Sequence, residues 1–221
     1  MTSHKFLTSR FPASRRVRTF LVAVVAAAAL MLAGCNSGGT PSGPDTTSPS
    51  ATESATPSPT PTPTPATETS RALNLIAPKL PEDASSNTKD GLQSFSRYYV
   101  ELLEYAYSTG EVSKLEGISS PTCSTCSGPI GDIENAYSDG GWVVGGDLEA
   151  TAVTTSFLPS STGSFFVNLS IKQGRTAYYS GPGILRKDIP APTEDAPMQL
   201  TAKFLSGAWQ VEDFSPPKGL Q

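Results

Sequence analysis

The sequence predicts an α+β domain, in which helices come first along the chain and antiparallel strands follow. Two patterns indicate this class. Apolar residues recur at helical spacing before residue 110, and they alternate with polar residues after residue 147. A change from a Pro- and Thr-rich composition to a mixed one near Pro78 places the domain at residues 78–221. This length is enough for one hydrophobic core.

Residues 1–34 have the features of a lipoprotein signal peptide. A cationic start precedes fourteen apolar residues, Phe20 to Ala33, which are fewer than the roughly 20 that a membrane-spanning helix needs. The run ends in Leu-Ala-Gly-Cys, which resembles a bacterial lipobox. We therefore expect Cys35 to carry a lipid that anchors the mature protein on the extracytoplasmic face of the cell membrane. The alternative is an ordinary secretory cleavage site beside an unmodified cysteine.

Removal of the signal changes the charge of the chain. The full sequence has 16 Lys and Arg against 20 Asp and Glu, and the signal contains five of the basic residues and none of the acidic ones. The mature chain therefore carries 11 basic and 20 acidic residues, a formal net charge of −9. An acidic protein without a basic run is not expected to bind nucleic acid.

Histidine is absent from the predicted mature chain, because the one histidine, His4, lies in the signal. A chain without histidine cannot form a Ser-His-Asp or Cys-His catalytic unit, nor a histidine-ligated metal site. We expect no cofactor and no bound metal.

The segment 35–77 is predicted to be a disordered stalk that begins at the lipidated cysteine. Residues 36–70 include eight prolines and seventeen Ser or Thr residues, and no large apolar side chain. Such a segment cannot bury enough surface to offset the entropy of ordering, and its proline spacing favours extended polyproline II conformations.

The first element of the domain is a helix over about residues 89–108. Asn87 or Thr88 can cap its start, and Gly110 can end it. One stripe of apolar residues at helical spacing is expected to face the core: Leu92, Phe95, Tyr99, Leu102, Leu103 and Ala106.

Charged residues fall on the opposite side of this helix. Arg97 and Glu101 are four positions apart, a spacing at which they can form an ion pair, and Glu104 lies on the same side. This face is predicted to be solvated, which argues against a catalytic role for Glu101.

Shorter elements complete the domain. A short helix is expected near residues 111–118, and a third one is expected to end at Gly140–Gly141. Alternation predicts strands at 147–153 and 165–172, and a hairpin is expected from 198–204 and 209–213.

The motifs between residues 78 and 153 resemble those of an actinobacterial lipoprotein family catalogued as domain of unknown function 6318. The family has no established activity, so the resemblance implies an envelope lipoprotein without naming its function. The residues that carry the resemblance are Leu80-Pro81-Glu82, the aromatic-rich helix Phe95–Tyr107, Thr109-Gly110, Cys123 with Cys126, and Gly140-Gly141-Trp142 with Gly145-Gly146.

By element order, the domain is also similar to the cone-shaped domains like nuclear transport factor 2, in which helices cover a curved antiparallel sheet of about four strands around a pocket. The predicted anchor and stalk, together with the aromatic content of the domain, favour a non-enzymatic binding or interaction module whose ligand is an envelope component or a small hydrophobic molecule. Aromatic side chains that can line such a pocket are Tyr99, Tyr137, Trp142 and Trp209.

An enzyme of the same cone-like class is one alternative. Without histidine, its acid and base would have to be a carboxylate and a tyrosine, for instance Asp132 or Glu134 with Tyr137. Acidic residues near the start of a helix are more often surface charges or caps, so this interpretation is the weaker one.

The pair Cys123 and Cys126 allows three interpretations: a redox centre, half of a metal site, or a local disulfide. A thioredoxin-like centre lies in a βαβ unit, and structural zinc needs four ligands, so both are disfavoured. Disulfides persist outside the cytoplasm, and with Cys35 lipidated these two cysteines are left to pair. Closing so short a loop is expected to stabilise the fold by about 2 kcal/mol.

Overall fold

The computed structural model describes residues 61–218. The signal peptide, Cys35 and the stalk up to residue 60 lie outside the described residues. No helix within 61–218 is long and apolar enough to cross a membrane. The helices are η1 (Asp83–Ser85), α1 (Lys89–Thr109), α2 (Ser113–Ile118), α3 (Ser124–Tyr137) and η2 (Ser138–Gly140). The strands are β1 (Trp142–Gly145), β2 (Leu148–Thr154), β3 (Ser164–Gln173), β4 (Thr176–Tyr179), β5 (Leu185–Ile189), β6 (Ala196–Leu205) and β7 (Ala208–Ser215).

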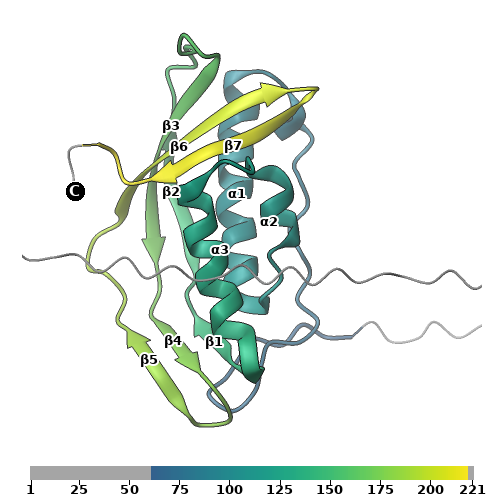
Figure 1. Ribbon diagram of the computed structural model, residues 1–221, viewed down its shortest axis with the longest axis vertical. Coiled ribbons are helices and arrows are strands. Elements are labelled where there is room, and N and C mark those ends of the chain that lie inside the picture. Colours follow the sequence, from purple (N-terminus) through teal and green to yellow (C-terminus); the bar gives the residue numbers. More distant parts are fainter. Residues whose placement is uncertain (1–60, 219–221) are drawn as a thin grey trace, which may run out of the picture. The chain divides into compact units, whose positions relative to one another are not determined.

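The predicted α+β class is confirmed, and the strands form two antiparallel sheets. The larger sheet has four strands in the order β2-β3-β6-β7, and the smaller has three in the order β1-β4-β5. The two sheets lie toward opposite ends of the domain (Figure 1). The sequence predicted the strands of the larger sheet only.

The two sheets are joined where one long antiparallel ladder bends. β1 leads into β2 through Gly145 and Gly146, and β3 leads into β4 through Gly174. The ladder continues across the bend, because the amide of Gly146 donates to the Arg175 carbonyl and the amide of Gly174 donates to the Asp147 carbonyl. Gly145 and Gly146 have φ angles of 73° and 81°, a region that glycine adopts without steric cost.

Helix α1 follows its prediction closely. The hydroxyl of Thr88 accepts a hydrogen bond from the Gly91 amide at the start, and Gly110 ends the helix with a φ of 83°. All six apolar residues of the predicted stripe are buried. Because they lie on one side of the helix, α1 packs across the inner face of the larger sheet, with the Tyr99 ring 5.0 Å from that of Phe214 in β7.

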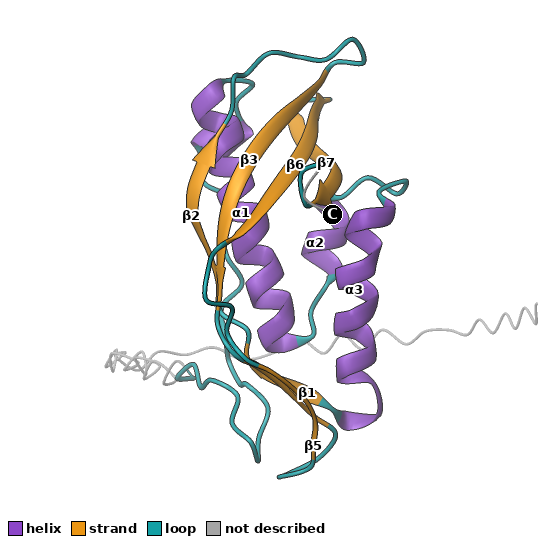
Figure 2. Cartoon of the chain, turned by 90° about the vertical axis from the view of Figure 1, so that its left-hand side faces the viewer, coloured by secondary structure: helices purple, strands orange, loops and turns teal. Residues whose placement is uncertain are grey.

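The hairpin of β6 and β7 is also as predicted, and its turn uses Ser206 and Gly207, both with positive φ. Helix α3 begins at Ser124, because Cys123 serves as its cap. The helix runs from β7 at one end to β1 at the other and contacts both strands (Figure 2).

Residues 61–77 differ from the stalk that their composition predicts. The indole nitrogen of Trp142 donates to the Thr67 carbonyl at 2.7 Å, and the amide of Gly183 donates to the Glu68 carbonyl at 2.8 Å. Ala66 packs against the small apolar cluster that contains Trp142. These hydrogen bonds are made to backbone carbonyls, which any sequence can offer, so composition could not reveal that the folded domain begins before residue 78.

Candidate functional site

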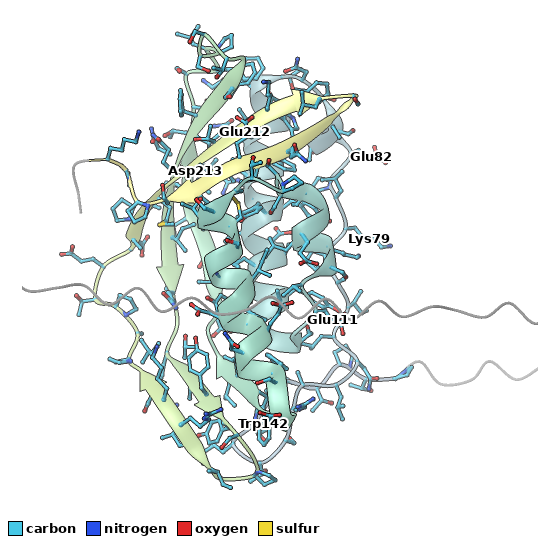
Figure 3. The ribbon with its side chains drawn as sticks, viewed as in Figure 1. Lys79, Glu82, Glu111, Trp142, Glu212 and Asp213 are labelled. Carbon is cyan, nitrogen blue, oxygen red and sulfur yellow. A yellow bond between two sulfur atoms is a disulfide. The ribbon has the colours of Figure 1, made fainter. Side chains whose placement is uncertain are left out.

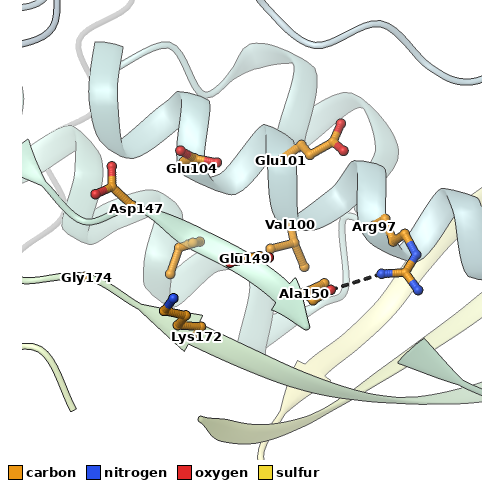
Figure 4. A pocket seen from close by; sticks show the side chains of 10 residues that line it. Arg97, Val100, Glu101, Glu104, Asp147, Glu149, Ala150, Lys172 and Gly174 are labelled. Carbon is orange, nitrogen blue, oxygen red and sulfur yellow. Dashed lines mark hydrogen bonds between the residues drawn. The ribbon is translucent and has the colours of Figure 1, made fainter. Parts of the chain in front are cut away.

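A groove of about 540 Å³ lies between α1 and β2, next to the bend that joins the two sheets (Figure 4). It is open to solvent on one side. Its lining combines charged and apolar residues from α1, β2, the end of β3 and the bend: Arg97, Val100, Glu101, Glu104, Asp147, Leu148, Glu149, Ala150, Lys172 and Gly174.

Helix α1 contributes one of its faces. Positions 97, 100, 101 and 104 follow the spacing that places residues on a single side of a helix. The ion pair that this spacing allows between Arg97 and Glu101 is not formed, because Arg97 instead donates to the Ala150 carbonyl at 2.9 Å. Ala150 lies on β2, which is an outer strand of the larger sheet. On its outer side no strand supplies a hydrogen-bond donor, and Arg97 supplies one to the Ala150 carbonyl.

The bend supplies the opposite wall. Asp147 directly follows the two glycines, and its side chain comes to the same end of the groove as Glu104 (Figure 4). Along β2, Glu149 lies opposite Lys172 of β3 in the strand register. Leu148 adds apolar surface from the same strand.

The groove has an excess of negative charge. Four carboxylates line it, from Glu101, Glu104, Asp147 and Glu149, against the two cations of Arg97 and Lys172. Burial raises the pKa of Glu104, and the nearby charges of Asp147 and Glu101 raise it further. A positively charged ligand group would relieve this repulsion, and the apolar wall can pack against an attached apolar part, so the groove suits a ligand that combines the two.

Sequence reasoning missed this groove because it assigned the charged face of α1 to solvent. Glu101 is exposed, as predicted, but Glu104 is only half-exposed. The one available signal was the sequence Gly145-Gly146-Asp147, which indicates a bend followed by a carboxylate.

The four aromatic residues expected to line a pocket are divided between two hydrophobic cores, and none of them lines this groove. Tyr99 and Trp209 belong to the main core. Trp209 contacts the rings of Phe165 and Phe204 at centroid distances of 5.4 and 5.0 Å, and its indole nitrogen donates to the Ser86 carbonyl at 3.0 Å. Tyr99 and Trp209 are both buried in this core, so neither is placed to line an open pocket.

Trp142 lies in a second, smaller core at the end of the domain away from Asp213 of β7 (Figure 3). Its ring stacks on that of Tyr179, with a centroid distance of 5.9 Å. Tyr137 packs beside this cluster, and its hydroxyl donates to the Tyr107 carbonyl at 2.8 Å. Both aromatic side chains therefore hold α3, β1 and β4 together.

An enzyme of this class would need an acid–base pair formed by Asp132 or Glu134 with Tyr137. The structure does not form this pair. The Tyr137 hydroxyl is already bonded to a backbone carbonyl, and burial raises the pKa of Tyr137 to about 12. Asp132 lies at the surface of α3, and Glu134 is exposed there. A tyrosine with so high a pKa is a poor proton donor or acceptor near neutral pH.

Cys123 and Cys126 form a disulfide across the start of α3. Both residues are buried, and the Cys126 amide donates to the Cys123 sulfur at 3.1 Å. All strand pairs of the two sheets are antiparallel, so the βαβ setting of a thioredoxin-like centre is not found within residues 61–218.

The domain thus combines an α+β fold with an acid-lined groove at a bend between two sheets. Residues 61–215 match the sequence profile described as "Family of unknown function (DUF6318)", and the chain belongs to this family. No curated protein matches the chain.

Two solved structures are similar in backbone arrangement. The intermembrane space region of the chloroplast protein ARC6 has a TM-score of 0.41 and 9% identity, covering 58% of this chain and 95% of that one. Aln2 from a Streptomyces species has a TM-score of 0.35 and 10% identity, covering 62% of this chain and 92% of that one.

Proposed function

We propose that the protein is a cell-envelope lipoprotein, held on the extracytoplasmic face of the membrane by lipid on Cys35, and that its folded domain is a non-enzymatic binding module. The anchor is supported by the order of cationic start, short apolar run and lipobox-like sequence. The binding role is supported by one observation above all, the groove between α1 and β2.

The groove favours a small ligand, or part of an envelope component, that carries a positive charge next to an apolar group. Glu104 and Asp147 approach from facing elements at one end, so a cation between them would be shared by two carboxylates (Figure 4). Val100, Leu148 and Ala150 offer apolar contact for the rest of the ligand. Because the site is partly open, weak to moderate affinity is expected.

The cone-like packing inferred from element order stays a prediction, and the proposal does not depend on it. Large side chains such as Trp209 and Phe165 are buried in the main core. The proposed ligand instead lies at the side of the sheet, against α1.

A binding experiment tests the groove. The mature chain is titrated with a short peptide that contains Lys and Leu, and in parallel with the same peptide in which Glu replaces Lys. We expect only the Lys peptide to bind, with affinity that falls as salt rises, and Glu104→Ala to weaken it by about fivefold or more. Glu111→Ala, an exposed carboxylate outside the groove, is the matched control. Equal binding by Glu104→Ala would contradict the proposal.

The anchor is tested separately by cell fractionation. We expect the protein in the membrane fraction, and Cys35→Ser to release it into the soluble fraction or the medium. Membrane retention of Cys35→Ser at the level of the unchanged protein would contradict lipid anchoring without affecting the proposal for the groove.

A further inference from the structure

A second groove lies beside the smaller sheet, between the C-terminal part of α3 and the hairpin of β4 and β5. It has a volume of about 390 Å³ and is open to solvent, and we name it the charged slot. It shares no residue with the groove between α1 and β2. Four charged side chains and one tyrosine are central to its chemistry: Asp132, Asp139, Arg186, Lys187 and Tyr178.

One wall of the charged slot is positive because β5 contains a bulge. In the strand register Tyr178 of β4 lies opposite Lys187. The next residue of β4, Tyr179, lies opposite Leu185, so Arg186 is an extra residue in β5. Consecutive residues of a regular strand point to opposite faces, and a bulge changes the direction of one of them. Arg186 and Lys187 therefore both line the charged slot, although they are neighbours in the chain.

The facing wall is negative. Asp132 lies on α3, and Asp139 follows in η2. The last carbonyl groups of a helix carry the negative end of its dipole, and α3 ends at Tyr137, beside the charged slot. The last turn of α3 contains no basic residue that would neutralise this end. The wall therefore attracts cations through its two carboxylates and through the helix end.

Tyr178 is close to a charge of each sign. The Lys187 ammonium lies 5.6 Å from the centre of its ring. Burial raises the pKa of Tyr178, and the nearby carboxylate of Asp132 raises it further. Lys187 and Asp132 nevertheless form no ion pair, because the one ion pair within residues 61–218 joins Arg175 to Asp188. The two walls thus carry opposite charges with open space between them.

We propose that the charged slot binds a small zwitterion, an amino acid or a short peptide whose ammonium and carboxylate groups are both free. The ligand carboxylate is directed to Arg186, whose guanidinium can donate two parallel hydrogen bonds to it, with Lys187 beside it. The ligand ammonium is directed to Asp132 and Asp139 at the end of α3. A ligand with charge of one sign only would be repelled by one of the walls. The inference does not rest on the groove between α1 and β2 or on its ligand.

A dipeptide with ends that can be blocked tests the charged slot. The mature chain is titrated with alanyl-alanine and, in parallel, with its N-acetylated and its C-amidated form, and backbone amide shifts are followed by NMR spectroscopy. We expect the free dipeptide to bind with a Kd of about 0.1–1 mM and to shift the amides of Tyr178, Arg186 and Lys187. Each blocked form is expected to bind about fivefold more weakly, because it loses one exposed charge contact.

Two variants assign the two ends of the ligand. Asp132→Asn is expected to weaken binding of the free and the C-amidated dipeptide by about fivefold and to leave the N-acetylated form unchanged. Arg186→Gln is expected to weaken the free and the N-acetylated dipeptide and to leave the C-amidated form unchanged. Glu134→Gln and Lys114→Gln are the matched controls, because they remove exposed charges of the same sign outside the charged slot. All four side chains are exposed, so folding should be preserved, which circular dichroism checks.

Three results would overturn the proposal. The first is equal affinity for the free and the blocked dipeptides, and the second is a loss of affinity when only one particular end is blocked. The third is the absence of a saturable shift at residues 178, 186 and 187 up to about 10 mM dipeptide. Glu104→Ala lies in the other groove and is expected to leave dipeptide binding unchanged, so the two sites are tested independently.

Discussion

The Thr125 hydroxyl donates a hydrogen bond to a carboxylate oxygen of Asp213 at 2.8 Å. The same hydroxyl oxygen accepts a bond from the Phe214 amide at 3.0 Å. Together with the bond from the Ser120 amide to the Val211 carbonyl, at 2.7 Å, these contacts cover the free edge of β7. Since β7 is an outer strand, its outward backbone groups would otherwise be available for pairing with another chain.

Replacing Thr125 by Val should therefore destabilise the domain. The change keeps the side-chain shape but removes both hydrogen bonds, and it leaves the Phe214 amide without its partner. We expect the free energy of unfolding to fall by about 1–3 kcal/mol, measured by urea denaturation, and the Phe214 amide to exchange its hydrogen faster. Ser124→Ala is the matched control, because the neighbouring exposed hydroxyl makes no hydrogen bond in the described structure, and a change within about 0.5 kcal/mol is expected.

The disulfide should also stabilise the hydrogen bonds between Thr125 and β7, because Thr125 lies between the two bridged cysteines. Removing the bridge increases the number of conformations open to the unfolded chain and frees the first turn of α3. We expect the double variant Cys123→Ser with Cys126→Ser to lose about 2 kcal/mol of unfolding free energy, and amide exchange to rise at Phe214. Thiol counting on the unreduced protein checks the premise, since two reactive thiols at these positions would contradict a bridge in the native protein.

One glycine that ends α1 and one that lies within α3 should change the stability of the domain in opposite directions when each is replaced by alanine. Gly110 ends α1 with a φ of 83°, and an added Cβ would lie 2.6 Å from the Tyr137 ring. Gly110→Ala is therefore expected to cost about 1–3 kcal/mol. Gly131 lies within α3 and an added Cβ there would meet no atom within 4 Å, so Gly131→Ala should stabilise the domain by about 0.5–1 kcal/mol. Thermal unfolding of both variants measures the contrast, and equal shifts would contradict this account of Gly110.

Elements with strong periodicity could be predicted from the sequence. Helix α1 has a capping residue, a full apolar stripe and a terminal glycine, and all three agree, so its bounds were predicted within one residue. The hairpin of β6 and β7 combines alternation with a glycine-containing turn. In each case local sequence and final packing point to the same structure.

The smaller sheet could not be predicted because its strands lack alternation. β4 has the sequence Thr-Ala-Tyr-Tyr, in which three of four residues are buried, and β5 has the sequence Leu-Arg-Lys-Asp-Ile, in which four of five are exposed. Their pairing depends on the bend at Gly145–Gly146, which carries the ladder of the larger sheet into the smaller one. Such a contact is set by the fold of the whole chain, which local periodicity does not report.

The groove escaped prediction for a related reason. A charged side chain on the polar face of a helix is usually solvated, and Glu101 follows that rule. Glu104, one turn further along, meets Asp147 because the bend brings β2 beside the end of α1. These two carboxylates lie far apart in the sequence, so only the folded chain shows that they are neighbours.

Glu104 should make stability depend on pH in a definite direction. Its pKa is raised in the folded domain, by burial first and then by Asp147 and Glu101, so the folded state holds this proton more tightly than the unfolded state. The free energy of unfolding must then fall as pH rises through the interval between the unfolded and folded pKa values. In Glu104→Gln the free energy of unfolding should fall less with rising pH. The difference should be a few tenths of a kcal/mol, because solvent partly screens this side chain. Melting curves from about pH 4 to about pH 8 measure it. Glu111→Gln, exposed and outside the groove, is the control, and an equal flattening in both variants would contradict a specific role for Glu104.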